Sequence, residues 1–297
     1  MAVINFIAGI PPFYLGLAFL TGLMVGSFLN VVIYRLPVML EHDWKQQCSE
    51  IMKLEAVEEK ATFNLLTPAS TCPSCGHRIT AWQNIPVLSY LVLRGKCAAC
   101  SARISPRYPV VELLTGIVSV AVVWRFGFTL EALAALFLSW TLIALSGIDL
   151  DHKLLPDSLT LLLLWTGLLI SLAGELVPAE TLFIKPADSI AGAVIGYLAL
   201  WSVYQLFLLI TGKEGMGYGD FKLLAALGAW LGFQQLPLVI FFSAMVGALA
   251  GIVMIFALGR DRQIPIPYGP YLAAAGWVAL MWGGDISAYY FHIAGLA

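Results

Sequence analysis

Charged residues are scarce in this sequence: Asp, Glu, Lys and Arg make up 11% of its 297 residues, whereas hydrophobic residues make up 60%. A soluble domain carries about 25% charged residues. So little charge cannot cover a water-exposed surface, which excludes an ordinary soluble protein. The net charge of −2 says little about partners, because the distribution of charge matters more than its sum, and no nucleic-acid partner is expected.

Basic residues are absent from positions 1–34, and the first of them, Arg35, follows a long apolar run. A secretory signal peptide carries its positive region before the apolar stretch, so the N-terminal segment is not expected to be a cleavable signal. The positive-inside rule places Arg35 in the cytoplasm and the N-terminus outside it.

Long apolar runs are what the sequence has in place of charge. A transmembrane helix needs about 20 mostly apolar residues, and about eight segments meet this requirement. They are residues 12–34, 109–127, 130–150, 158–176, 188–210, 217–236, 238–258 and 270–291, with the boundary between the sixth and seventh the least sharply marked. The sequence therefore predicts an all-α polytopic membrane protein with about eight transmembrane helices.

The basic residues support this topology. With eight spans, every Lys and Arg except Arg125 and Lys185 falls on the same side as Arg35, which the positive-inside rule makes the cytoplasm. Both termini are then outside. The expected organisation is a first transmembrane helix in 1–35, a cytoplasmic module in 36–108, and a seven-helix membrane domain in 109–297. In the module, residues 39–60 are rich in charge and are expected to form a surface helix or a mobile segment.

Four of the five cysteines lie in the module as two Cys-x-x-Cys pairs: Cys72, Cys75, Cys97 and Cys100. Two residues between cysteines let one turn aim both thiolates at a single ion, and four thiolates make a closed tetrahedral zinc site. A redox pair or unrelated buried cysteines are the alternatives, but stable disulfides are rare in the cytoplasm. So small a module cannot bury enough core to fold alone, and metal binding would supply the missing free energy. We predict a structural zinc site, with Cys48 left as a free thiol.

Two aspartates mark a second candidate site. Asp149 ends the predicted span 130–150, and Asp220 opens the span 217–236 in Gly217-Tyr-Gly-Asp220. Both are then within about one turn of the membrane surface on the same side, where ionisable groups are costly and mark function. Two carboxylates brought together share one proton, so the pair can act as general base and general acid on one water. This is the chemistry of an aspartic protease.

A structural role competes with catalysis at these acids. Gly217 and Gly219 would let the backbone approach a peptide closely, but a glycine-rich loop with Asp220 capping the next helix is the plainer interpretation. Asp157 follows a proline at a natural helix cap, and Asp151 and His152 lie in a turn and are expected to be solvated.

Together these residues resemble the type IV prepilin peptidase family, the prepilin leader peptidase/N-methyltransferases. The resemblance covers nearly the whole chain. Its most specific parts are the segment from Gly26 to Pro37, the four cysteines, the segment from Ile104 to Glu112, the segment from Ile148 to Asp157, and the segment from Lys213 to Lys222.

The resemblance implies a bifunctional enzyme of the bacterial inner membrane, with periplasmic termini and a cytoplasmic module. The family's catalytic aspartates fall on Asp149 and Asp220. The enzyme would cut after a Gly that ends the short basic leader of type IV prepilins and pseudopilins, and would then methylate the new N-terminal amine with S-adenosylmethionine as donor. Its partners would be these precursors and membrane lipid.

Other roles follow only as hypotheses. The sequence has no Gly-x-Gly-x-x-Gly motif after a strand that would indicate a methyltransferase domain, so the S-adenosylmethionine site is unknown. Arg94, Gly95 and Lys96 are candidates for it. The preferred alternative is that these three residues form a turn leading into the second cysteine pair. The acidic stretch from Glu41 to Glu59 could attract a basic leader or be a solvated face. Lys213 or Lys222 could pair with an acid near the substrate's new N-terminus or extend to the membrane surface, which is preferred.

Three other functions compete with this enzyme. A non-enzymatic membrane assembly factor would use the zinc module to dock partners and would tolerate loss of both aspartates. A transporter predicts acids at mid-membrane and related halves, and the sequence has neither feature. A zinc metalloprotease is disfavoured, because there is no His-Glu-x-x-His motif and four cysteines leave zinc no open position.

Overall fold

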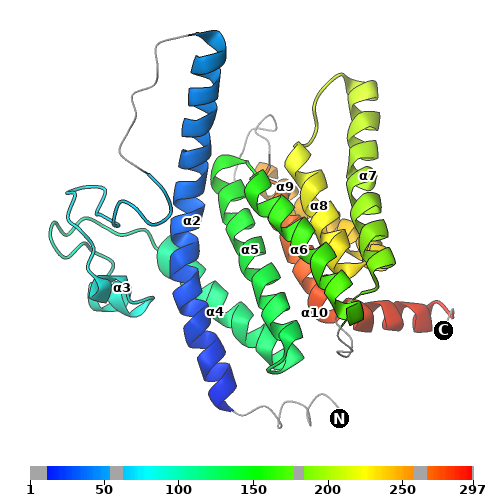
Figure 1. Cartoon of the computed structure of the whole chain (residues 1–297), viewed down its shortest axis with the longest axis horizontal. Helices are drawn as coiled ribbons and strands as arrows, with labels where there is room; N and C mark the ends of the chain where they lie inside the picture. The colour runs from blue at the N-terminus through cyan, green and yellow to red at the C-terminus, as the bar shows by residue number, and fades with distance from the viewer. Residues whose placement is uncertain (1–11, 54–62, 177–183, 257–265, 296–297) are drawn as a thin grey trace. The chain divides into compact units, whose positions relative to one another are not determined.

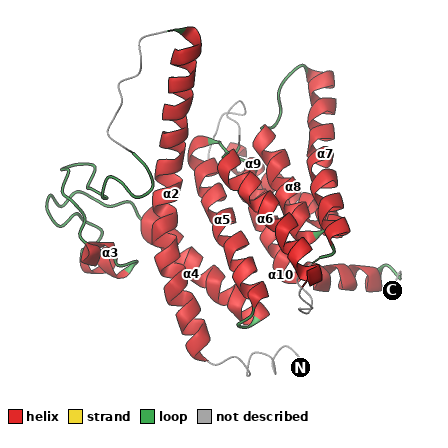
Figure 2. Cartoon of the chain, viewed as in Figure 1, coloured by secondary structure: helices red, strands yellow, loops and turns green. Residues whose placement is uncertain are grey.

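This computed structural model describes residues 12–53, 63–176, 184–256 and 266–295, and their regular structure is helical (Figures 1 and 2). The described chain divides into two compact units, residues 1–144 and 145–297. Helix α5 (Leu130–His152) begins in the first unit and ends in the second. The part of the acidic stretch that includes Glu55, Glu58 and Glu59 lies outside the described residues.

Two long helices form the frame of the first unit. Helix α2 (Pro12–Met52) packs along α4 (Arg107–Phe126), and small residues allow their close approach. A Cβ on Gly26 would lie 2.7 Å from the Cα of Glu112, so only glycine permits this contact. Helix α2 continues well past the predicted span, which confirms a surface helix in the charged segment as far as Met52.

Arg35 ties the module to α2. Its guanidinium is buried and donates hydrogen bonds to the backbone oxygens of Asn64 (2.8 Å) and Pro68 (2.7 Å), and it lies over the ring of Phe63. The described part of the module then forms a short 3₁₀ helix, η1 (Ala81–Asn84), and a short helix, α3 (Leu88–Val92).

The second unit is built around a central helix. It contains the helices α6 (Asp157–Leu176), α7 (Pro186–Thr211), α8 (Tyr218–Leu231), α9 (Leu236–Phe256) and α10 (Gly269–Ile293), with the 3₁₀ helix η2 (Phe233–Gln235) between α8 and α9. Helix α8 packs against α6, α7 and α10, and nearly all its residues from Asp220 to Trp230 are buried. A helix that is apolar on all sides belongs in the interior.

A helix occupies each of the eight predicted positions, and six of the described helices are long and apolar enough to cross a membrane. Helices α8 and α10 are not among the six. Helix α8 has 14 residues, about 21 Å at the rise of an α-helix, and it ends where Gly232 adopts a φ of +79°. Helix α10 has 25 residues but is less apolar than the six.

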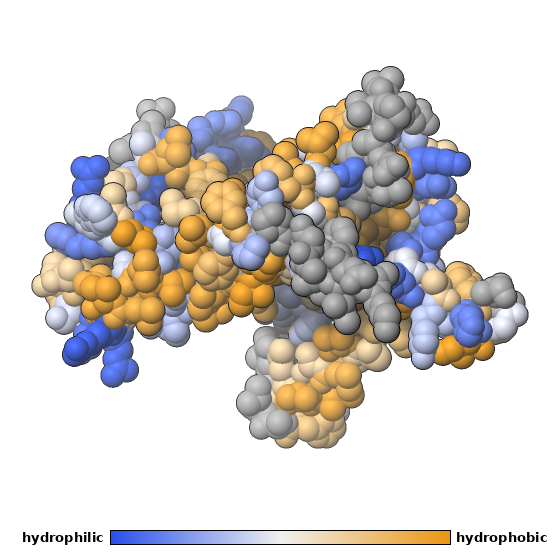
Figure 3. All heavy atoms as spheres, turned by 90° about the horizontal axis from the view of Figure 1, so that it is seen from below, coloured by the Kyte–Doolittle hydropathy of each residue, from blue (hydrophilic) through white to orange (hydrophobic). Residues whose placement is uncertain are grey.

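Apolar side chains also face outward over much of the surface (Figure 3). Ile117 on α4, Trp165 on α6 and Leu209 on α7 are 59%, 60% and 82% exposed. Exposed apolar surface of this extent marks a contact with membrane or protein, and on helices of this length it is the surface expected to meet lipid.

Candidate active site and metal centre

Asp149 lies in the last turns of α5 and is only 5% exposed. Its Oδ2 accepts a hydrogen bond of 2.9 Å from the backbone N–H of Gly269, the first residue of α10. The N-terminus of a long helix carries partial positive charge and unpaired N–H groups. Helix α10 therefore holds and orients one carboxylate oxygen of Asp149.

Gly269 is a site residue that the sequence did not reveal. A Cβ at this position would lie 2.7 Å from the Asp149 Oδ2 and 3.0 Å from Leu155 Cδ2, so a larger residue would displace the carboxylate. The signal that was available is Gly269-Pro270 at the start of the last apolar segment, because proline in the first turn marks a helix N-terminus.

Asp220 lies in the first turn of α8, after Gly217 at the N-cap position, and is 7% exposed. The two aspartates interact electrostatically. Leu155 links their surroundings: a Cβ on Gly219 would lie 2.7 Å from the Leu155 Cβ, and Leu155 also contacts Gly269. Gly219 therefore closely approaches Leu155 of the same chain. The approach of a peptide to Gly217 and Gly219 stays a prediction.

The second unit thus brings together the two aspartates predicted to act together, from α5 and α8, with the N-terminus of α10 beside them. Asp151 and His152, at the end of α5, are exposed as expected. The arrangement provides two buried carboxyl groups that interact, which is the requirement for general acid–base chemistry on one water.

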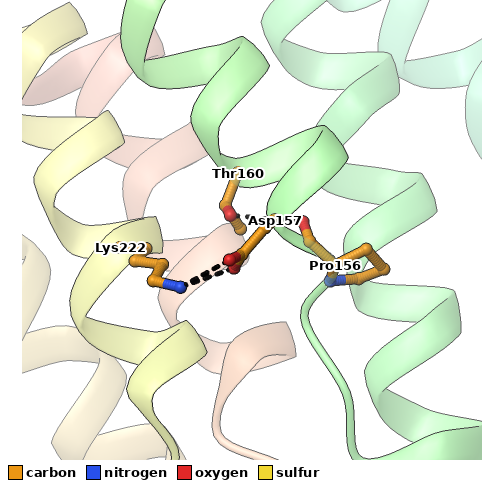
Figure 4. A network of polar contacts seen from close by, with 4 residues as sticks. All are labelled: Pro156, Asp157, Thr160 and Lys222. Carbon is orange, nitrogen blue, oxygen red and sulfur yellow. Dashed lines mark hydrogen bonds and ion pairs between the residues drawn. The ribbon is translucent and has the colours of Figure 1, made fainter. Parts of the chain in front are cut away.

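Asp157 and Lys222 form an ion pair between α6 and α8 (Figure 4). The Lys222 Nζ lies 2.6 Å and 2.7 Å from the two carboxylate oxygens of Asp157. Helix α6 does begin at Asp157, but the carboxylate serves this pair. In the structure Lys222 therefore pairs with an acid of its own chain, and the two roles expected for it stay predictions. The pair holds the first turn of α8, which carries Asp220, against the start of α6.

The four predicted metal ligands come together in the first unit. The Sγ atoms of Cys72, Cys75, Cys97 and Cys100 all lie within 4.8 Å of one another, and those of Cys72 and Cys100 are 3.9 Å apart. Four sulfurs at about 2.3 Å from a central zinc would be separated by about 3.8 Å. The cluster fits a tetrahedral zinc ion, and Cys48 lies outside it as an exposed free thiol.

The two cysteine pairs adopt the same backbone structure. Cys72 N–H donates to His77 O (2.9 Å), as Cys97 N–H donates to Ala102 O (2.8 Å). The residue after the second cysteine has a positive φ in both, +70° at Gly76 and +59° at Ser101. The sequence predicted the pairing of the cysteines, but it did not predict the equivalence of Gly76 and Ser101, because serine gives no turn signal comparable to glycine.

Backbone N–H groups prepare the first cysteine of each pair for metal binding. Hydrogen bonds from the N–H groups of Ser74 and Cys75 lower the pKa of the Cys72 thiol to about 6. Those of Cys100 and Ala99 lower the pKa of Cys97. Because the thiolate is the form that binds metal, these hydrogen bonds favour the ligand form of Cys72 and Cys97.

Arg94 and Gly95 form the turn that was the preferred alternative to a cofactor site. Arg94 has a φ of +53° and Gly95 a φ of +67°, and Gly95 N–H donates to Tyr90 O (2.9 Å). This turn ends α3 and leads directly into the second cysteine pair.

Comparisons with known proteins identify the family of the chain. The Bacterial Peptidase A24 N-terminal domain matches residues 20–126, and the Type IV leader peptidase family matches residues 136–252. The chain belongs to the type IV leader peptidase family. The first match covers the cysteine cluster, and the second covers both aspartates.

The similarity to individual relatives extends along the whole chain. A prepilin leader peptidase/N-methyltransferase of Stutzerimonas stutzeri is 55% identical over all of both chains. Proteins of the same name from Pseudomonas aeruginosa and Aeromonas hydrophila are 52% and 54% identical over 99% and 95% of both chains. No solved structure matches the chain. With its apolar helices, the chain is a multi-pass inner-membrane protein of this family.

Proposed function

We propose that the chain cleaves the leader peptide of type IV prepilins and pseudopilins through Asp149 and Asp220, and then N-methylates the new N-terminus. The observation that carries the peptidase assignment is the meeting of two buried carboxyl groups, one held by the N-terminus of α10 and the other in the first turn of α8. The names of the relatives support both activities.

The cleavage follows from the shared proton of the pair. One carboxylate accepts a proton from a water molecule as the water oxygen attacks the scissile carbonyl carbon. The other carboxyl group donates its proton to the carbonyl oxygen, giving a neutral tetrahedral diol. Proton transfer to the amide nitrogen then breaks the C–N bond, which releases the leader with a new carboxyl group and the remaining protein with a free amine. The pair returns to its initial charge.

The position of the aspartates suits this class of substrate. Asp149 is in the last turn of an apolar helix, and Asp220 opens α8, so we place the site at the cytoplasmic membrane face. A prepilin keeps a basic leader in the cytoplasm and an apolar helix in the bilayer. Its scissile bond would then lie at the depth of the two carboxylates. In this orientation the cysteine module is cytoplasmic and both termini are periplasmic.

Zinc and S-adenosylmethionine complete the proposal. Cys72, Cys75, Cys97 and Cys100 would hold zinc as a closed structural site, because four thiolates leave no position for a water or substrate. S-adenosylmethionine would supply the methyl group to the amine released by cleavage.

The test is cleavage of a purified prepilin peptide in detergent by wild type, Asp149→Asn and Asp220→Asn. Asp151→Asn is a matched control, because this acid is two residues from Asp149 but exposed. We expect both site variants to remain folded with bound zinc and to lose cleavage by at least about 10³-fold, which is about 4 kcal/mol of transition-state stabilisation, while the control cuts normally.

Wild-type cleavage by either site variant would overturn the assignment of that aspartate. If both variants also support normal pilin processing in cells, the chain is an assembly factor and not the peptidase. Methylation is measured separately, on a peptide that already carries the free N-terminus.

A further inference from the structure

One part of the cysteine module is strongly basic. Residues 70–108 contain no Asp or Glu but five basic residues: Arg78, Arg94, Lys96, Arg103 and Arg107. The first four of these are exposed. A zinc ion held by four thiolates is itself anionic, but the basic side chains outweigh its charge. The segment is therefore suited to an anionic surface, and it is unsuited to the basic leader of the proposed substrate.

The same segment exposes large apolar side chains. Leu88, Leu91 and Val92 on α3 are 60%, 64% and 80% exposed, and Trp82 on the neighbouring η1 is 82% exposed. Residues three and four apart share one face of a helix, so α3 presents a continuous apolar face. The helices η1 and α3 pack against each other. Trp is the side chain most typical of the membrane–water interface.

A partly buried hydrogen bond sets the depth of α3. The backbone N–H of Val87, directly before α3, donates to Glu112 Oε2 at 2.8 Å. Glu112 is buried and lies five residues after Arg107, the first residue of α4, which is about 8 Å along the helix axis. The start of α3 is thus fixed beside an inner turn of a membrane-spanning helix and not beyond its end.

The backbone of Val87 shows that this attachment is specific. Val87 has a φ of +60°, which is unfavourable for a β-branched residue. Such strain persists only where the surrounding contacts over-determine it.

Figure 1 shows α3 level with α4 and far from the upper end of α2. In the view from below, the module at the left of Figure 3 presents orange apolar atoms flanked by blue atoms.

We propose that Trp82 and the apolar face of α3 insert into the membrane interface, with Arg94 and Lys96 on anionic lipid headgroups. The occupant is the bilayer that surrounds the protein, because the face lies at the depth of α4 and carries the charge that anionic lipids attract. The second cysteine pair follows α3 directly, so this contact would place the four-cysteine cluster at the membrane surface. The inference concerns membrane docking and does not depend on the peptidase assignment.

The experiment uses spin labels on the zinc-loaded full chain in vesicles of phosphatidylcholine with phosphatidylglycerol, in a Cys48→Ser background. Labels are placed at Leu91→Cys, at Ile117→Cys on α4 as the lipid reference, and at Gln47→Cys on the exposed end of α2 as the water reference. We expect Leu91 to match Ile117 in collisions with oxygen and to be protected several-fold, relative to Gln47, from a water-soluble nickel complex. Val92→Cys repeats the test should the Leu91 variant lose zinc.

Two other outcomes overturn the proposal. If Leu91 and Val92 match Gln47 in vesicles that hold only the purified protein, the face is not in the bilayer and belongs to a protein partner. If their spectra show spin–spin broadening, it belongs to a second copy of the chain. The charge requirement is tested with Arg94→Gln/Lys96→Gln and with pure phosphatidylcholine. Each change should reduce the burial of the Leu91 label, and unchanged burial in both would overturn the headgroup contact.

Discussion

Gly269 has a tightly restricted position at the proposed active site. Its backbone N–H holds the Asp149 carboxylate, and its missing side chain leaves the space that the carboxylate occupies. Both properties depend on the start of α10, 120 residues after Asp149 in the chain, and only the folded second unit brings the two together.

Gly269→Ala should therefore damage the site more than the fold. The added Cβ would lie 2.7 Å from Asp149 Oδ2, and a displacement of about 1 Å in a catalytic group can cost about 10²-fold in rate. We expect kcat for leader cleavage to fall by about that factor with little change in KM. Gly284→Ala on the same helix is the control, because nothing lies within 4 Å of its Cβ. Equal rates for the two variants would contradict this role of Gly269.

The two cysteine turns allow a matched comparison at one structural position. Gly76→Ala places a side chain at a φ of +70°, whereas Ser101→Gly removes one at +59°. A side chain in the left-handed region costs about 1–2 kcal/mol. Gly76→Ala should release zinc to a chelator faster than wild type, and Ser101→Gly should retain it as long or longer. Faster release from Ser101→Gly would mean that its hydroxyl stabilises the turn.

At the scale of elements, the position of α8 determines the geometry of the proposed active site, because this helix carries Asp220. Its first turn is fixed to α6 by Lys222 and Asp157, and its last turn contacts α7 through two glycines. A Cβ on Gly228 would overlap the backbone oxygen of Gly192, so the two backbones are in direct contact. Small residues permit such close packing of membrane helices.

Gly228→Ala should separate α7 from α8. Overpacking of this kind costs about 1–3 kcal/mol, and we expect a lower melting temperature together with reduced cleavage. Gly16→Ala on α2 is the control, since its Cβ would meet nothing within 4 Å. A melting temperature equal to that of the control would show that α7 and α8 adjust without cost.

The ion pair of Asp157 and Lys222 should matter for alignment more than for stability. Asp157 is mostly exposed, and exposed pairs contribute about 0–1 kcal/mol. Lys222→Met should reduce kcat by up to about tenfold with little change in melting temperature. The exchange Asp157→Lys/Lys222→Asp should recover part of the loss, while each single change should not. An exchange variant no better than Lys222→Met would assign Lys222 a role other than this pair.

At the scale of the whole molecule, the sequence predicted the features that depend on residues close together in the chain. Apolar length predicted the helices, cysteine spacing predicted the cysteine cluster, and the expected depth of Asp149 and Asp220 predicted the candidate site. The sequence did not give contacts between distant segments: Gly269 with Asp149, Lys222 with Asp157, and Val87 with Glu112. Each joins residues on different elements, and no periodicity or turn signal reports such a contact. Helix α8 was also expected to be longer, because apolar composition continues past Gly232, where the backbone ends the helix.

Removal of the proposed zinc should destabilise the cysteine module and leave the helices around α8 folded. The described part of the module has little regular structure besides η1 and α3, so we expect its fold to depend on the proposed zinc, as in other small metal-bound modules. Both aspartates lie in residues 145–297 on helices that pack around α8. After a chelator strips the metal, amide exchange should become fast in residues 70–105 and remain slow in α8. Cleavage of a short leader peptide should persist at about half or more of the wild-type rate if the module has no part in the acid–base step. Fast amide exchange in α8 would instead mean that the metal centre stabilises the membrane domain. Cleavage would then be measured again after zinc is restored.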